Sequence, residues 1–200
     1  SLSSKIKPLI KYNHDRVTVL ELKCIDYDLI IINVYMPYLD RSDLQNAVSK
    51  FDEMIGFIDY IMAERIDAQF VILGDFNCNI YSPTHPFAAS LNDFIQSHIM
   101  VSTFSQMESF NAETTFTRRD SRSKSLLDYV FVSQEIGKVV TKVSVGDYHD
   151  NHSDHLPVEV ELTVQLSNLN GRANNSTNTK PNIIWSKLSS NELENYCYYD

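Results

Sequence analysis

Apolar and polar residues alternate along some segments of the chain and recur every three or four positions along others, which predicts both strands and helices. Residues 16–24 (RVTVLELKC) alternate, and residues 28–36 (DLIIINVYM) form a nearly continuous apolar run that ends before Pro37. Residues 156–166 (LPVEVELTVQL) alternate near the carboxyl end. We expect strands at these places.

Three shorter apolar segments are also expected to form strands: residues 70–73, which end at Gly74, residues 114–117 and residues 126–133.

Two segments have the spacing of amphipathic helices. From Ser42 to about Asp67 apolar residues recur every three or four positions, and either Ser42 or Asp43 can cap the helix. Residues 87–99 repeat the pattern over a shorter length. Strands interleaved with helices predict an α/β or α+β domain in which helices cover the sheets.

The composition fits one folded domain followed by a change of character. The chain has 200 residues, 43% of them hydrophobic, and residues 1–166 contain all the patterned segments. Residues 167–182 (SNLNGRANNSTNTKPN) have almost no apolar content and are expected to be a linker. Residues 183–200 (IIWSKLSSNELENYCYYD) are expected to begin a following segment.

The apolar runs, cysteines and net charge of the chain each exclude a class of protein. No apolar run is long enough to cross a bilayer and the amino end has no signal-peptide block, so we expect an intracellular protein without a membrane partner. Three widely spaced cysteines fit neither a disulfide framework nor a zinc site. A net charge of −9 argues against a domain that merely coats nucleic acid.

Basic residues nevertheless gather in one short segment, at Arg118, Arg119, Arg122 and Lys124. A cluster of this kind is either a solvated loop or a contact with a nucleic-acid backbone, and both interpretations stay open.

Polar side chains follow the predicted buried strand in VILGDFNCNI, residues 71–80. If strand geometry continues past Gly74, Asp75 and Asn77 face the same side. A carboxylate can hold a hard cation or accept a proton from water, and an amide can donate to a phosphate oxygen. The alternative is an ordinary turn, because Gly, Asp and Asn are common turn residues.

Two further strand ends carry groups that can take part in chemistry. In IINVYMPY, Tyr35 offers a hydroxyl donor, although it can equally be an amphipathic edge residue. In SLLDYVFVS, Asp128 lies inside an apolar strand, where an unpaired charge is costly, so we expect it to have a partner such as an imidazole.

Histidine and aspartate are concentrated in HDNHSDHLPVEV, which directly precedes the last predicted strand. Asp154 can serve as a metal ligand and His155 as a general acid or base. The three histidines, His149, His152 and His155, are an alternative indication of zinc, but their spacing fits no closed tetrahedral set and no cysteine pair supports it.

The order N-V-Y-x-P, G-D-F-N, L-D-Y and S-D-H-L-P resembles the endonuclease/exonuclease/phosphatase superfamily over about residues 16–166. Within it, IINVYMPY, SLLDYVFVS and the tail at residues 183–200 resemble the apurinic-type endonuclease domain of non-long-terminal-repeat retrotransposons. The residues that carry the resemblance are Asn33, Tyr35, Pro37, Gly74, Asp75, Asn77, Asp128, Ser153, Asp154 and His155.

The resemblance implies a DNase I-like fold, a two-layer β-sandwich flanked by helices, with the site at one edge. It implies that His155 is a general acid/base or transition-state stabiliser oriented by Asp128, and that Asp75 positions or deprotonates the attacking water. The remaining implied roles are phosphate contact by Asn33, Tyr35 and Asn77, Mg²⁺ or Mn²⁺ binding by Asp154, and nucleic-acid contact by Arg118, Arg119, Arg122 and Lys124.

The activity implied is metal-dependent phosphodiester hydrolysis, in particular nicking of duplex DNA. The parent polyprotein would then carry a reverse transcriptase and the protein would be nuclear. The alternatives are a phosphatase or an RNA exonuclease of the same superfamily, and an inactive truncated relic. The family's first two strands carry an Asn and a metal-binding Glu, and nothing before Asn33 matches them; Glu21 stands in a different context. We therefore expect the domain to be incomplete at its amino terminus and to comprise roughly its carboxyl-terminal two thirds.

Overall fold

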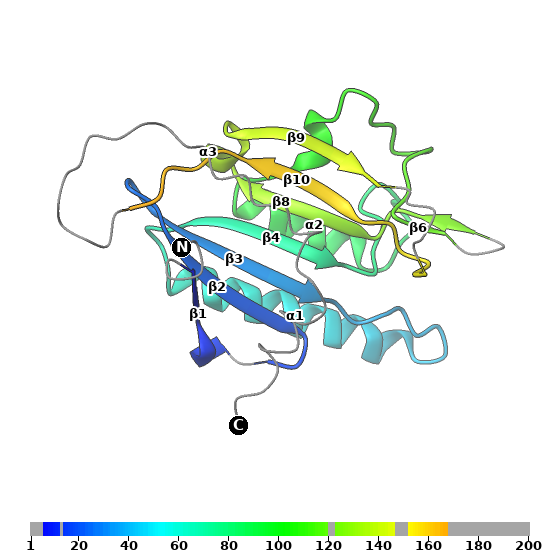
Figure 1. The fold of residues 1–200 in the computed structure, drawn as a ribbon. Helices are drawn as coiled ribbons and strands as arrows, with labels where there is room; N and C mark the ends of the chain where they lie inside the picture. The colour runs from blue at the N-terminus through cyan, green and yellow to red at the C-terminus, as the bar shows by residue number, and fades with distance from the viewer. Residues whose placement is uncertain (1–5, 13, 120–122, 147–151, 168–200) are drawn as a thin grey trace.

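A computed structural model describes residues 6–12, 14–119, 123–146 and 152–167, and the fold is that of these residues (Figure 1). The predicted linker, apart from Ser167, and the predicted following segment lie outside them. Within the described ranges, no helix is long and apolar enough to cross a membrane.

The main sheet has six strands in the order β1-β2-β3-β4-β8-β5. These strands are β1 (Ile6–Pro8), β2 (Val17–Lys23), β3 (Asp28–Tyr35), β4 (Gln69–Asp75), β8 (Asp128–Ser133) and β5 (Met100–Ser102). Strands β3 and β4 are parallel and the other neighbours are antiparallel, so the sheet is mixed. Because β4 and β8 run in opposite directions, the carboxyl end of β4 lies beside the amino end of β8.

One face of this sheet is covered by helices. The helical elements are η2 (Ile10–Tyr12), α1 (Leu44–Ala63), α2 (Ala88–Ser97), η3 (Thr103–Gln106) and α3 (Gln134–Gly137). The exception is α3, whose buried Ile136 belongs to the apolar cluster on the opposite face. Helix α1 connects the two parallel strands, and its buried residues, among them Phe51 and Ile58, share a core with Ile32 and Ile72 of the sheet. Asp43 caps α1 by accepting a hydrogen bond from the backbone N–H of Asn46 at 3.2 Å.

The opposite face packs against a second layer, the antiparallel pair β9 (Val140–Val145) and β10 (Val158–Leu162). Val158 and Val160 of this layer pack against a second apolar cluster that includes Val71 and Val132. A short hairpin of β6 (Arg118–Arg119) and β7 (Lys124–Ser125) projects beyond these layers (Figure 1). The expected α/β fold, with two layers of strands and flanking helices, is therefore present.

Several predicted boundaries were wrong. Gly74 does not end the buried strand, which continues to Asp75. Residues 114–117 are not a strand, because regular pairing with β7 begins at Arg118. The predicted strand at 156–166 pairs with β9 only over residues 158–162.

Strands β1, β5 and β9 were not predicted. The first two have three residues each, too few for a periodic pattern to be recognised, and β9 lacks a regular alternation of buried and exposed positions.

Candidate active site

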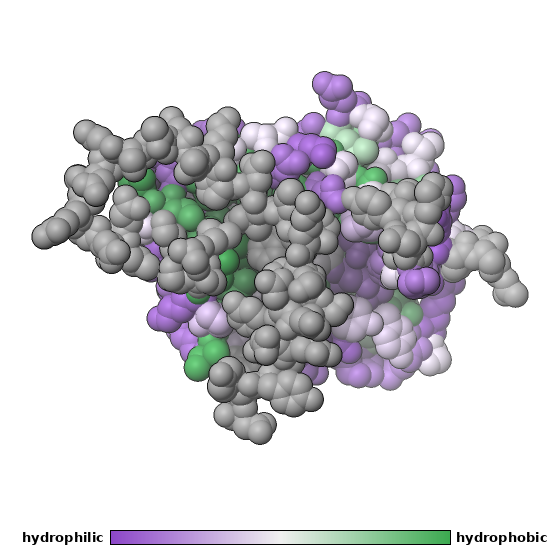
Figure 2. Space-filling view, viewed as in Figure 1, coloured by the Kyte–Doolittle hydropathy of each residue, from purple (hydrophilic) through white to green (hydrophobic). Residues whose placement is uncertain are grey.

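Three polar side chains form a row across adjacent strands at one end of the main sheet. In the parallel pair Tyr35 lies opposite Asp75, and in the antiparallel pair Asp75 lies opposite Asp128. Residues in register across neighbouring strands project from the same face. Asn33 precedes Tyr35 by two positions and therefore shares this face. Hydrophilic residues gather on the side of the molecule where these strands end (Figure 2).

His155 reaches this row from the segment that leads into β10. Its ring nitrogen Nδ1 lies 3.0 Å from Oδ2 and 3.2 Å from Oδ1 of Asp128. This contact confirms the prediction that Asp128 has an imidazole partner. Because an ionised carboxylate only accepts hydrogen bonds, Nδ1 carries the proton, which leaves Nε2 as the nitrogen that can take up or share a proton.

Asp75 completes a compact group with this pair. One ligand atom from each of Asp75, Asp128 and His155 lies within 4.8 Å of the others. Burial raises the pKa of Asp75, against the opposing effects of the Asn77 backbone N–H, His155 and Arg118. Burial also raises the pKa of Asp128, and the charge of Asp75 adds to this effect, whereas the charge of Asp154 helps to raise the pKa of Asp75. The group therefore favours a bound proton or cation.

Asn77 contributes to this group through a turn. Its backbone has a positive φ of 48°, its N–H donates to Asp75 Oδ1 at 2.8 Å, and its Nδ2 donates to the carbonyl of Met36 at 2.9 Å. The strand continues past Gly74 only as far as Asp75, so the condition for Asp75 and Asn77 to face the same side is not met, and the turn interpretation holds for the backbone of Asn77. The turn fixes the carboxylate of Asp75 above the strand end.

Asp154 lies in an ion pair, with Arg118 Nε at 2.8 Å from its Oδ2. The backbone N–H of Arg119 donates to the carbonyl of Asp154 at 2.8 Å, and Arg118 forms an isolated bridge with His155. The basic hairpin is thus packed directly against the segment that carries the site histidine.

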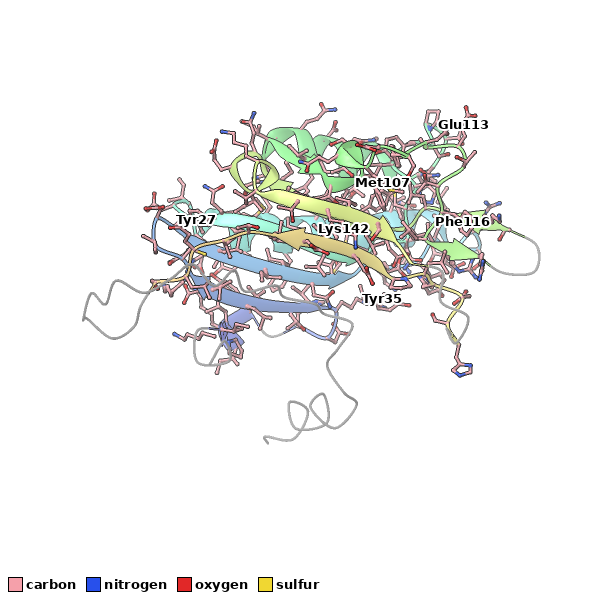
Figure 3. The ribbon with its side chains drawn as sticks, turned by 45° about the horizontal axis from the view of Figure 1, so that its top comes forward. Tyr27, Tyr35, Met107, Glu113, Phe116 and Lys142 are labelled. Atoms are coloured by element: carbon pink, nitrogen blue, oxygen red, sulfur yellow. The ribbon has the colours of Figure 1, made fainter. Side chains whose placement is uncertain are left out.

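The other basic residues of the cluster lie farther along the hairpin. Lys124 Nζ lies 4.2 Å from the ring centroid of Phe116, whereas Arg122 lies outside the described residues, as does His149. His152 is exposed. Phe116 and Tyr35 lie toward the same end of the sheet, and Tyr27 lies at the other (Figure 3).

Tyr35 stands at the rim of the site with 52% of its surface exposed. Arg16, which was not predicted as a site residue, lies over its ring at 5.0 Å and donates to its carbonyl at 3.3 Å. The sequence offered no signal for Arg16, because the pairing of β2 with β3 creates this contact.

Thr117 was also missed. Its side chain is completely buried, and its hydroxyl donates to Asp128 Oδ2 at 2.6 Å. Nothing in the printed sequence distinguishes it from Thr114 and Thr115, which precede it.

The donor set fits a divalent metal ion such as magnesium. Mg²⁺ is usually bound through one or two carboxylates together with waters and substrate phosphate. The charge of Asp154 helps to raise the pKa of Asp75, and these two carboxylates could provide those protein oxygens. Asp128 is already occupied by Thr117 and His155.

The raised pKa of Asp75 predicts a trade-off between function and stability. In the folded state this carboxyl binds a proton more readily than in the unfolded state. Its favourable contribution to the free energy of unfolding is therefore present at acid pH and is lost as the pH rises through the raised pKa. Asp75→Asn removes the half-buried charge but keeps the acceptor for the Asn77 N–H. At pH 7.5 we expect Tm to rise by about 2–4 °C, the equivalent of about 1 kcal/mol in a domain of this size.

Thermal unfolding at pH 7.5 and pH 4 checks this expectation, with no gain expected at pH 4. Asp93→Asn, at an exposed position of α2, is the matched control and should leave Tm unchanged. A lower Tm for Asp75→Asn at pH 7.5 would show that the ionised carboxylate is stabilising, against the argument from burial.

Comparisons with known proteins find a family model that matches the sequence and solved structures that share the fold. A family model described as endonuclease-reverse transcriptase matches residues 29–159. No curated protein matches the chain.

Solved structures share the fold at low identity. The catalytic domain of APE2 from Xenopus laevis has a TM-score of 0.61 and 20% identity over 83% of this chain and 60% of its own. The endonuclease domain of TRAS1, a telomere-specific non-LTR retrotransposon, has a TM-score of 0.56 and 14% identity, covering 80% of this chain and 67% of that one. The 3′ phosphatase NExo from Neisseria, bound to a product DNA hairpin, has a TM-score of 0.58 and 17% identity over 78% of this chain and 70% of its own.

The family match spans most of the chain and includes Asp75, Asp128 and His155. The solved structures independently support the DNase I-like arrangement of sheet and helices. The chain belongs to the endonuclease–reverse transcriptase family of the endonuclease/exonuclease/phosphatase superfamily.

Proposed function

We propose that this chain hydrolyses phosphodiester bonds with a divalent metal ion and nicks duplex DNA as a retrotransposon-type nuclease. The observation that carries the proposal is the compact group of Asp75, Asp128 and His155 at the end of the sheet. Membership of a superfamily of nucleases and phosphoesterases supports the class of reaction. The DNA hairpin bound to one structural neighbour favours DNA as the substrate, and the retrotransposon endonuclease among the neighbours favours the retrotransposon type.

The protein groups of the site suit attack by water on a phosphodiester. Asp75 and His155 form a cooperating pair, in which one group takes the proton of the attacking water and the other donates a hydrogen bond to the phosphate or its leaving oxygen. Asp128 keeps the proton of His155 on Nδ1 and so presents Nε2 to the substrate. Asn77 and Tyr35 would contact the phosphate from the strand ends.

A magnesium ion held by Asp75 and Asp154 would neutralise charge on the phosphate oxygens and lower the pKa of a bound water. To reach such an ion, the carboxylate of Asp154 would exchange its contact with Arg118, whose guanidinium could then pair with a backbone phosphate.

The chain carries a net charge of −9, yet basic residues lie at the proposed DNA contact. Arg119 and Lys124 of the hairpin, and Arg16 at the rim, are cations beside the site end of the sheet. Phosphate contacts of this kind position the duplex without reading its sequence.

A substrate panel tests the proposal. The 200-residue chain is incubated with supercoiled plasmid, single-stranded RNA and a phosphoinositide, each with Mg²⁺ or with EDTA. We expect Mg²⁺-dependent conversion of supercoiled plasmid to nicked circles, with slower turnover of the other substrates. Faster turnover of RNA or phosphoinositide would favour the exonuclease or phosphatase alternative, and no turnover of any substrate would favour the inactive relic.

The proposal extends to the parent polypeptide, in which a reverse transcriptase would follow the nuclease, as the description of the matched family suggests. A nuclease that opens chromosomal DNA for reverse transcription would act in the nucleus.

A further inference from the structure

We infer that Thr117 is a positioning residue that locks Asp128 and His155 into one orientation. The inference deepens the proposed function where it concerns activity, because Thr117 does not itself reach the reacting atoms. It lies at the end of the segment that leads into β6, with no exposed surface.

The hydrogen bonds of the Thr117 hydroxyl leave it only one orientation. A hydroxyl has one hydrogen to donate and two lone pairs to accept with. The backbone N–H groups of Leu127 and Asp128 donate to this oxygen at 3.0 and 2.9 Å, which uses both lone pairs. The single hydrogen therefore goes to Asp128 Oδ2, at 2.6 Å.

This arrangement determines how Asp128 meets the histidine. Oδ2 of Asp128 receives the Thr117 hydroxyl and also lies 3.0 Å from Nδ1 of His155. The carboxylate is thus held from one side by the hydroxyl while it accepts from the ring on the other. The backbone N–H of Asp128 donates to the Thr117 hydroxyl oxygen and therefore does not compete with His155 for the carboxylate.

The main chain of Thr117 ties the histidine segment to the same point. Its carbonyl accepts from the N–H of Leu156 at 2.6 Å, and its N–H donates to the carbonyl of Ser125 at 3.0 Å. Leu156 directly follows His155 in the chain. One residue therefore fixes the carboxylate through its side chain and the histidine through its backbone, where the start of β6 meets the starts of β8 and β10 (Figure 1).

Thr117→Val keeps the shape of the side chain and removes only the hydroxyl. The N–H groups of Leu127 and Asp128 then lose their acceptor in a buried place, which is costly. The Asp128 carboxylate already contacts this hydroxyl at 2.6 Å, so we expect it to turn toward these N–H groups as their new acceptor and away from His155. Thr117→Ser retains the hydroxyl and should retain the orientation.

The matched control is Thr103→Val. Thr103 is also completely buried, but its hydroxyl has no hydrogen-bond partner among the described residues. Removing that hydroxyl should leave the fold and the histidine unchanged.

Nitrogen-15 NMR of the 200-residue chain, at a pH where His155 is neutral, provides the readout that does not depend on activity. We expect His155 to be protonated on Nδ1 in the wild type, in Thr117→Ser and in Thr103→Val, and to become a mixture of tautomers in Thr117→Val. An unchanged tautomer in folded Thr117→Val would overturn the inference. If Thr117→Val does not fold, the wild-type spectrum decides, since a wild-type His155 protonated on Nε2 would equally overturn it.

Plasmid nicking provides the second readout. In Thr117→Val we expect kcat to fall by about 10–100-fold, the usual effect of removing a partner that orients a site residue, with little change in KM. Restoration by Thr117→Ser supports positioning, whereas an equal loss in Thr117→Ser would contradict it. If the wild type shows no nicking, the proposed function fails while the NMR comparison still tests the inference.

Discussion

Replacement of His155 by alanine is expected to lower kcat for Mg²⁺-dependent plasmid nicking by about 10²–10⁴-fold, the range typical of a lost general acid or base. The reason is that Asp128 holds the ring through Nδ1 at 3.0 Å, so that Nε2 is the nitrogen assigned to proton transfer in the proposed reaction. The side chain of His155 is 31% exposed, so its removal should disturb the core little and Tm should change only slightly.

His152→Ala is the matched control for this variant. His152 stands three positions earlier in the same segment and is exposed. The His152→Ala variant should nick plasmid at the wild-type rate. Equal losses of activity in the two variants would show that the segment matters only for folding or for DNA contact.

Gly74→Ala is expected to be strongly destabilising, because β4 can pass its neighbour here only without a side chain. A Cβ atom built at Gly74 would lie 1.9 Å from the carbonyl oxygen of Val34 and 2.9 Å from its carbonyl carbon. Both are backbone atoms of β3, which cannot move without breaking the ladder. Gly74 also has a φ of +135°, which side chains rarely adopt.

Strain of this kind costs about 1–3 kcal/mol at a single residue, and the collision adds to it. We expect a loss of at least about 3 kcal/mol in the free energy of unfolding, or roughly 6–12 °C in Tm. Since Tyr35 and Asp75 directly follow Val34 and Gly74, nicking should fall as well. Thermal unfolding monitored by circular dichroism measures the first effect.

Gly56→Ala serves as the control. Gly56 lies within α1, and a Cβ atom there meets nothing within 4 Å. Alanine should therefore stabilise the helix by about 0.5–1 kcal/mol. A wild-type Tm for Gly74→Ala would mean that β3 and β4 are paired differently from the register described.

Much of the fold could be predicted from local pattern. The continuous apolar run at residues 28–36 and the helical spacing after Asp43 both correspond to observed elements, β3 and α1. These patterns are clear because α1 buries one face against the sheet, whereas most apolar residues of β3 lie inside the core. Strand β9 could not be predicted in this way, because its intermediate burial arises from packing between layers.

The site was predictable where chemistry demanded a partner. A carboxylate at the half-buried position of Asp128 requires one, and His155 provides it. The contact of Arg118 with Asp154 and the hydroxyl of Thr117 were not predictable, since both depend on how the hairpin is placed against β8 and β10. The local sequence does not show how the hairpin packs against these two strands.

The central claim, that Asp75 and His155 act together in one phosphodiester-cleaving site, is tested most directly by a double-mutant comparison. Plasmid nicking rates are measured in Mg²⁺ for the wild type, Asp75→Asn, His155→Ala and the double variant. When two residues act as a unit, removing either one abolishes most of the rate enhancement that both provide. The double variant should therefore nick about as slowly as the slower single variant. Wild-type rates in either single variant, or losses that multiply in the double variant, would contradict the claim.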